Sequence, residues 1–102
     1  MTIQLSANLN QRIRYLCYSK YMSIFKNINV LDLTIGPVGG LTTMVMADFG
    51  ASVIKIEPLK GDPFRKMPSS TTWLRGKKSI AIDLKIHSEQ VKLHAYIKNA
   101  DV

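Results

Sequence analysis

Three glycines and one glutamate carry the clearest chemical signal in this sequence of 102 residues. Gly36, Gly39 and Gly40 lie between two apolar runs, where the backbone must turn. Such a turn, when it leads into a helix, can present backbone N–H groups to a phosphate. The spacing matches neither the dinucleotide fingerprint nor the phosphate-binding loop. Glu57 follows about 20 residues later, where nucleotide-binding folds place a ribose-binding acid, and a capping or solvated glutamate is the alternative.

A basic turn and two histidines are further candidates. Arg75, Lys77 and Lys78 could reach phosphate groups, and a solvated charged turn is the alternative. His87 and His94 are seven residues apart, with no cysteine or paired acid beside them. This set lacks the ligands of a zinc site, so we predict no metal centre.

The aspartates of the apolar segments are expected to be structural. Asp32 lies inside the first predicted strand and Asp83 near the end of the third, where each would fix a turn or pair with a base. Asp48 is expected to face solvent. We therefore predict none of the three as a nucleophile.

A strand–turn–helix–strand unit positions these residues. Residues 28–33 and 52–57 are apolar with little alternation, as in strands covered on both faces. Residues 38–49 between them predict a helix, with one apolar stripe made of Val38, Leu41, Val45 and Phe49. Two strands joined through one helix must be parallel neighbours with a right-handed crossover.

The rest of the chain extends an open sheet. Residues 58–72 are rich in turn formers and predict a loop. Residues 79–84 predict a third strand, and Ser88 can cap a helix that runs to about residue 98. Residues 99–102 predict the turn into another strand. Two helices cannot cover both faces of three parallel strands, so the fold class is α/β with an incomplete open sheet.

The overall charge limits the classes of partner. Fourteen Lys and Arg against seven Asp and Glu give a net charge of +7. This surplus favours phosphates, nucleic acid or anionic membranes, and a solvated basic surface is the alternative. Aromatic residues do not interleave with basic ones, so we predict no specific nucleic-acid binding. No apolar run reaches the roughly 18 residues of a membrane span, and the single cysteine, Cys17, fits a reducing compartment.

Residues 1–27 do not share this pattern, and we predict them to be an extension, disordered or wrongly started, before a domain of residues 28–102. The extension contains no acidic residue. We favour Met22 as the true start and a cytoplasmic protein. The alternative is a mitochondrial presequence over residues 1–21 of a eukaryotic protein.

Five segments together resemble the N-terminus of a known family. They read INVLDLT, ADFGASVIKIEP, GDPFR, RGKKSIAIDLK and NADV, in this order between residues 28 and 102. In order and spacing they look like the family III CoA-transferases, also called the CaiB/BaiF family. That family includes formyl-CoA and carnitine CoA-transferases and α-methylacyl-CoA racemase. Its members usually begin near Met22 and continue well beyond Val102, so we expect an N-terminal fragment.

The resemblance implies a truncated, open Rossmann-like α/β fold that binds coenzyme A or an acyl-CoA as substrate, with no tightly bound cofactor. Full-length members form an interlocked homodimer. Carried over position by position, the residues that line the CoA site are Ile35, Gly36, Pro37, Val38, Pro58, Leu74, Arg75, Gly76 and Lys77. Some members have an arginine where this chain has Pro58, so one contact to the ligand is missing or supplied elsewhere.

The resemblance also implies where catalysis would occur. The transferases use an aspartate that attacks the acyl-CoA thioester to give a mixed anhydride, and an acceptor carboxylate finally receives the CoA. The racemases use a His and an Asp to move the α-proton. Both sets lie downstream of the matched part, so we expect no catalytic residue here and an inactive isolated chain. We predict the CoA-binding part of an acyl-CoA:carboxylate CoA-transferase-like enzyme of acyl-CoA metabolism; a racemase-like fragment or a non-catalytic CoA-binding remnant is the alternative.

Overall fold

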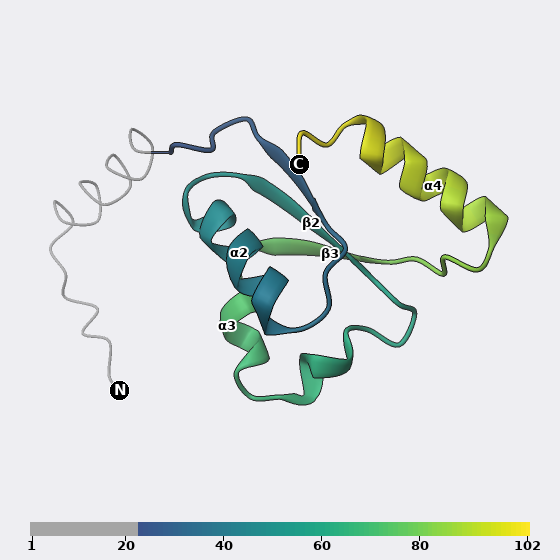
Figure 1. Ribbon diagram of the computed structural model, residues 1–102, viewed down its shortest axis with the longest axis horizontal. Coiled ribbons are helices and arrows are strands. Elements are labelled where there is room, and N and C mark those ends of the chain that lie inside the picture. The colour runs from purple at the N-terminus through teal and green to yellow at the C-terminus, as the bar shows by residue number, and fades with distance from the viewer. Residues whose placement is uncertain (1–22) are drawn as a thin grey trace, which may run out of the picture.

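The computed structural model describes residues 23–102, so the predictions for a presequence and for a start at Met22 lie outside the described residues. The elements follow in the order β1 (Asn29–Asp32), α2 (Pro37–Asp48), β2 (Ser52–Glu57), a 3-10 helix η1 (Pro63–Lys66), α3 (Ser70–Leu74), β3 (Lys77–Ala81) and α4 (His87–Lys98) (Figure 1). No helix of this part of the chain is long and apolar enough to cross a membrane.

The three strands form one parallel sheet in the order β1-β2-β3. Val30 pairs with Val53 between the first two strands, and Ile56 pairs with Ile80 between the second and third. The open α/β class and the parallel neighbours predicted from the sequence are therefore confirmed.

The last two residues extend the sheet beyond β1. Asp101 N donates to Asn29 O at 2.8 Å, and Leu31 N donates to Val102 O at 2.8 Å. Figure 1 shows the C-terminus beside β1. The turn toward a further strand after residue 98 is thus confirmed, and it leads to the edge of the sheet opposite β3. A crossover from one edge of the sheet to the other creates the switch point at which open α/β sheets bind ligands.

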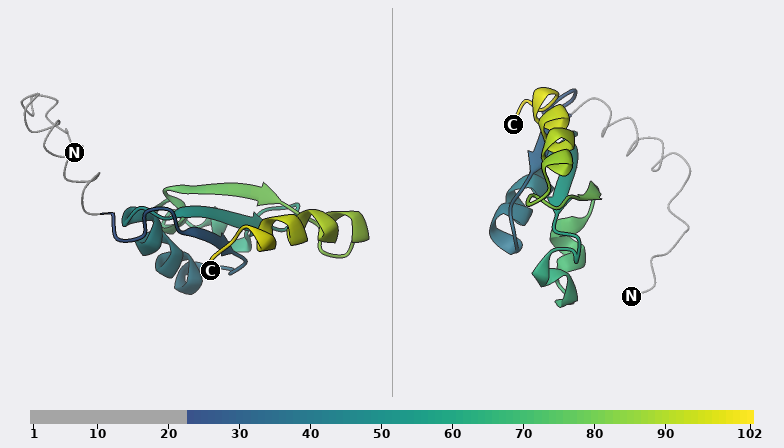
Figure 2. Two further views of the ribbon diagram at one scale, coloured as in Figure 1. Left: turned by 90° about the horizontal axis from the view of Figure 1, so that it is seen from above. Right: turned by 90° about the vertical axis from the view of Figure 1, so that its right-hand side faces the viewer.

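Alternation along the strands gives the sheet two different faces. Val30 and Val53 pack with Ala51 and with Ala47 of α2 on one face. On the other face, Ile56 and Ile82 pack with Leu93 of α4; Leu31, Ile54, Ile80 and Tyr96 surround them. α4 lies well apart from α2 and α3 in every view (Figures 1 and 2). Phe25, which precedes the predicted domain boundary, also packs on the first cluster.

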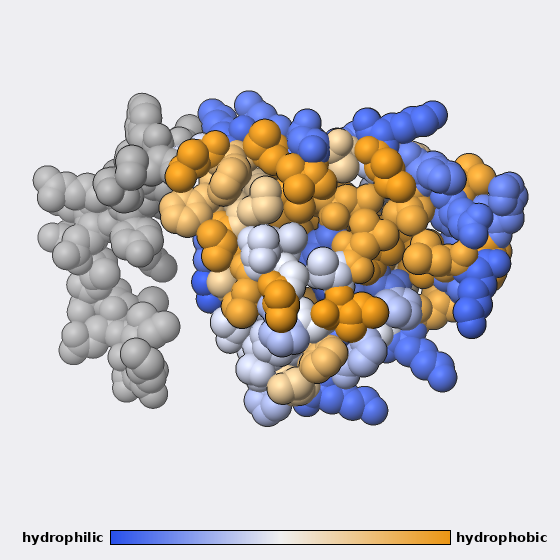
Figure 3. All heavy atoms as spheres, viewed as in Figure 1, coloured by the Kyte–Doolittle hydropathy of each residue, from blue (hydrophilic) through white to orange (hydrophobic). Residues whose placement is uncertain are grey.

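The predicted apolar stripe of α2 is not its buried face, and that prediction was wrong. Val38 is 83 % exposed, and the other three members are 44 % to 45 % exposed. The helix buries Gly40, Thr43 and Met44 instead. A Cβ on Gly40 would lie 2.5 Å from Cδ1 of Trp73 in α3. α3 therefore approaches too closely at Gly40 for any side chain there, while Met44 is buried on the same helix. Apolar side chains cover much of the molecular face shown in Figure 3.

Three boundary predictions also need correction. β3 begins at Lys77 rather than residue 79, because Lys77 already pairs with Val53, and the strand ends at Ala81. Helix α4 begins at His87 after Ile86, and Ser88 is not its cap. The predicted loop of residues 58–72 contains η1 and the start of α3. The Asp62 side chain begins η1 by accepting a hydrogen bond from Phe64 N.

Candidate functional site

A cavity of about 500 Å³ opens at the carboxyl ends of the three strands. Its walls come from Leu33 and Ile35 after β1, from residues 56–60 at the end of β2, and from residues 82–85 after β3. Open α/β sheets bind their ligands at this edge, because the loops that follow parallel strands converge there. The cavity is thus the best-placed ligand site in residues 23–102.

The cavity is mostly apolar with a charged rim. Lys60 and Lys85 supply positive charge, and Asp83 and Glu57 supply negative charge. Asp83 Oδ1 accepts a hydrogen bond from Lys85 N at 3.0 Å, which shapes the turn after β3. No ion pair within residues 23–102 involves Lys60 or Lys85. Both ammonium groups are consequently available to an anionic ligand.

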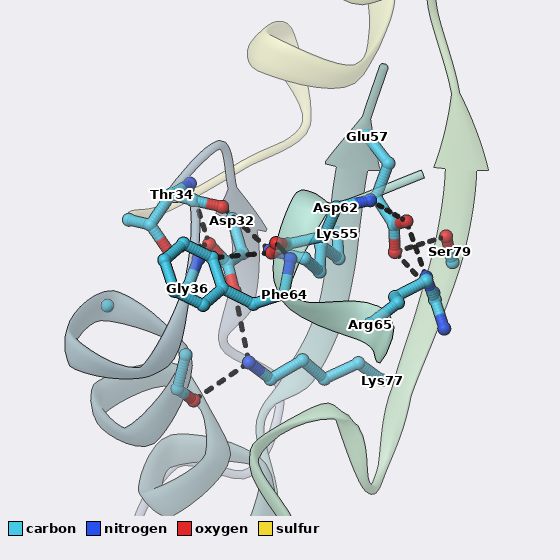
Figure 4. Close-up of polar contacts among 12 residues, drawn as sticks. Asp32, Thr34, Gly36, Lys55, Glu57, Asp62, Phe64, Arg65, Lys77 and Ser79 are labelled. Atoms are coloured by element: carbon cyan, nitrogen blue, oxygen red, sulfur yellow. Dashed lines mark hydrogen bonds and ion pairs between the residues drawn. The ribbon is translucent and has the colours of Figure 1, made fainter. Parts of the chain in front are cut away.

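Beneath the cavity, the face of the sheet toward α2 carries a buried ionic network (Figure 4). Its first pair joins β1 to β3: Lys77 Nζ lies 3.0 Å from Asp32 Oδ2 and 2.8 Å from Gly40 O. Thr43 and Thr34 hydroxyls donate to the same carboxylate, each at 2.6 Å. Burial raises the pKa of Asp32, but these hydrogen bonds outweigh it and hold the pKa below its usual value. Asp32 pairs with a base, as expected.

The second pair links the turn after β1 to the loop after β2. Lys55 Nζ lies 3.1 Å from Asp62 Oδ2 and donates to Thr34 O at 2.7 Å. Asp62 Oδ2 also accepts from Gly36 N at 3.1 Å. Both side chains of the pair are almost fully buried, at 1 % and 2 % exposed. Burial raises the pKa of Asp62, while hydrogen bonds from the Phe64 and Gly36 N–H groups and from Lys55 bring it below its usual value.

The third pair closes the end of β2. Arg65 donates to both carboxylate oxygens of Glu57, with Nε 2.7 Å from Oε2. Ser79 Oγ and Asp62 N add further hydrogen bonds, each at 2.9 Å. The Arg65 hydrogen bonds are the main cause that lowers the pKa of Glu57 to about 2. Glu57 is therefore not solvated, and that reading was wrong. Its carboxylate instead accepts the N–H group of Asp62, the residue that caps η1, in line with the capping alternative.

The network balances its own charge. Three cations, Lys55, Arg65 and Lys77, pair with three carboxylates, Asp32, Glu57 and Asp62. A buried charge is tolerated only when it is paired, so each lysine here is committed to its partner. The network does not offer a net positive charge to a phosphate, and the rim lysines of the cavity do.

The structure brings together only some of the residues carried over from the family. Ile35 and Pro58 both line the cavity. Gly36, with φ at +78°, gives its N–H to Asp62, and Pro37 begins α2 with Val38 exposed beside it.

The second group of carried-over residues lies away from the cavity. Leu74 ends α3, and Gly76, with φ at +72°, forms the turn before β3. The Arg75 guanidinium lies 2.6 Å from Asp48 Oδ2 at the surface. Lys77 is buried against Asp32 with its side chain 2 % exposed.

Sequence reasoning missed Lys55, Asp62 and Arg65 as parts of the site. The signal was present in the strands, because Lys55 and Glu57 alternate with apolar residues in β2. A charged residue at every second position of a strand covered on both faces must find a buried partner. Alternation indicates the need for partners, but it does not reveal which loop supplies them.

The glycines of the turn serve packing as well as turning. A Cβ on Gly39 would lie 2.3 Å from Thr34 Oγ1. On Gly36, a Cβ would lie 2.9 Å from Cε2 of Phe64. The glycine pattern thus reflects close approach of the protein's own side chains. No group of three or more His, Cys, Asp or Glu able to hold a metal lies within residues 23–102.

The chain is an α/β unit with a cavity at the carboxyl ends of its strands, and comparison with known proteins identifies its family. Residues 25–102 match the model of CoA-transferase family III, and the chain belongs to this family. It is 36 % identical over 86 residues to the succinyl-CoA–D-citramalate CoA-transferase of Chloroflexus aurantiacus, covering 74 % of this chain and 21 % of the relative. It is 31 % identical over 94 residues to the succinyl-CoA:mesaconate CoA-transferase of Haloarcula hispanica, covering 79 % of this chain and 24 % of the relative.

Solved structures agree with this family assignment. The crystal structure of the hypothetical protein Rv3272 from Mycobacterium tuberculosis superposes with a TM-score of 0.70 at 32 % identity. It matches 78 % of this chain and 23 % of that one. The chain therefore spans between a fifth and a quarter of the length of these relatives. The resemblance found in the sequence segments is confirmed.

Proposed function

We propose that this chain forms the CoA-binding N-terminal part of an acyl-CoA:carboxylate CoA-transferase. The observation that carries the proposal is the cavity at the carboxyl ends of the strands, in a chain that belongs to CoA-transferase family III. The two relatives described above are named for transfer from succinyl-CoA to a carboxylic acid, which favours a transferase over a racemase. An acyl-CoA thioester is accordingly the proposed ligand.

The cavity suits the two chemical halves of such a ligand. Apolar walls around Ile35, Ile56 and Ile82 can cover the uncharged pantetheine arm. Lys60 and Lys85 at the rim can meet the phosphate charges, because every buried cation of the network already has a partner. In this proposal the lysines after β2 and β3 take the phosphate role that the sequence assigned to Arg75 and Lys77.

This chain would bind and orient the thioester but not transfer it. Asp32 and Asp62 are committed to buried lysines, and Asp48 pairs with Arg75 at the surface. The covalent aspartate that the family resemblance implies lies downstream of the matched residues. We propose that catalysis needs the remaining part of the fold and the interlocked homodimer of full-length members. We also propose a cytoplasmic location, since the chain has one cysteine.

Calorimetric titration of the purified 102-residue chain with CoA tests the proposal. ADP and dephospho-CoA serve as controls, because they lack the pantetheine arm and the 3′-phosphate respectively. We expect saturable binding that is tightest for CoA. A chain that is folded by circular dichroism and does not bind CoA would refute the proposal. Incubation with succinyl-CoA and a dicarboxylate should give no transfer, and turnover above the blank would contradict the assignment of catalysis to other residues.

A further inference from the structure

We propose that Lys55 and Asp62 act as a positioning clamp. The clamp fixes two walls of the cavity, the turn after β1 and the loop after β2, and closes the turn after β1 to external anions. This inference rests on the proposed function for its ligand. The clamp itself is an arrangement of the protein's own groups. Nothing in the family assignment gives these two residues a role.

The clamp holds the first wall through two backbone groups. Lys55 Nζ donates to Thr34 O at 2.7 Å, and Asp62 Oδ2 accepts from Gly36 N at 3.1 Å. These groups flank Ile35 on both sides, and Ile35 forms the wall after β1. The backbone on each side of the wall residue is therefore tied to the same buried ion pair.

The clamp holds the second wall through the loop after β2. Asp62 N donates to Glu57 Oε2 at 2.9 Å, and Gly61 N donates to Pro58 O at 2.7 Å. Pro58 and Lys60 of this tight turn line the cavity. One carboxylate, that of Asp62, thus connects the turn after β1 with the turn after β2 (Figure 4). Loss of its charge would free both walls to move relative to each other.

The clamp also explains why the glycine turn is not a phosphate site. Asp62 already occupies the Gly36 N–H, which a ligand phosphate would otherwise need. Phe64 covers the same glycine, since a Cβ placed on Gly36 would meet its ring at 2.9 Å. An incoming phosphate would have to displace a carboxylate that is 2 % exposed and paired with Lys55. In this proposal the phosphate groups of the ligand therefore bind Lys60 and Lys85 at the rim of the cavity instead.

Asp62→Asn tests the clamp, because it keeps the shape of the side chain and removes its charge. We expect CoA affinity to fall about tenfold or more, since small displacements of binding groups have large effects. Val53→Ala is the matched control. Val53 is 2 % exposed and belongs to the apolar cluster with Val30 and Ala51, which does not line the cavity. This control should lower the melting temperature and change CoA affinity less than about twofold. Wild-type affinity in folded Asp62→Asn would overturn the proposal.

A double variant separates positioning from stability. Lys55→Met with Asp62→Leu replaces the buried ion pair by apolar side chains, so that neither partner is left charged and unpaired. We expect it to fold and to bind CoA as weakly as Asp62→Asn, which also covers the case in which the single variant does not fold. Wild-type affinity in this variant would refute the clamp.

A ligand-free measurement distinguishes failure of the clamp from failure of the proposed function. Hydrogen exchange by NMR reports the Gly36 amide, which Asp62 protects. If the wild-type chain does not bind CoA, the proposed function fails, and the clamp is judged on this amide alone. Faster exchange at Gly36 in Asp62→Asn than in Val53→Ala supports it. Equal exchange in the two variants overturns it.

Discussion

Replacing Glu57 by Gln should destabilise the fold through loss of charge rather than loss of shape. The Glu57 side chain is 3 % exposed and accepts hydrogen bonds from Arg65, from Ser79 and from Asp62 N. A glutamine at this position would turn its N–H₂ group toward some of these hydrogen-bond donors. A protonated glutamate would do the same with its O–H group. The variant therefore imitates the protonated state of Glu57, and the pKa of this group gives the magnitude.

The pKa of Glu57 falls from 4.5 to about 2 in the folded chain. At about 1.4 kcal/mol for each tenfold change in proton affinity, this corresponds to roughly 3 kcal/mol. The Arg65 side chain is 43 % exposed, so solvent screens part of the interaction and we expect a loss of about 2 kcal/mol. Because the folded-state pKa is lowered, this stabilisation is complete above about pH 5 and disappears as the pH falls through 4.5 toward about 2.

Urea unfolding followed by tryptophan fluorescence measures the effect. Trp73 is the single tryptophan of the chain and is 4 % exposed, so its emission reports loss of the α2–α3 contact. The difference between wild type and Glu57→Gln should be about 2 kcal/mol at pH 6 and should shrink toward zero near pH 2.5. Glu89→Gln, which makes the same change in a surface pair, should differ from wild type by less than about 0.5 kcal/mol. A Glu57→Gln difference that stays constant with pH would refute the reasoning.

Three further outcomes are expected. Lys77→Met should lower the free energy of unfolding by about 3–5 kcal/mol, because it leaves Asp32 charged and unpaired inside the protein, and a loss below about 1 kcal/mol in urea would contradict this. Gly40→Ala should cost about 1–3 kcal/mol, because the new Cβ would lie 2.5 Å from Trp73 Cδ1; helix propensity alone would give a gain, so increased stability would exclude the clash. Lys60→Ala should weaken CoA binding and reduce its salt dependence while the urea midpoint stays unchanged, and unaltered affinity at low salt would remove this lysine from the site.

Local patterns determined the class of fold. The bounds of β2 agree with its apolar run, and the helical spacing after the glycines predicted α2 to within a residue at each end. These elements are set by short-range preferences and by periodicity, which a sequence displays directly. The order of the five segments identified the family, because five segments in the right order are more specific than any single segment.

Tertiary structure alone decided which face of α2 is buried and which charges are available. Val38 has the spacing of a core residue and is exposed, because α2 buries the face that carries Gly40 and Met44 instead. Lys77 has the position of a phosphate ligand and is committed to Asp32, 45 residues away in the sequence. Lys55 and Asp62 look unrelated in the chain and form one buried pair. Pairing of distant charges depends on strand register and loop placement, and neither is encoded in the local pattern that gave the fold.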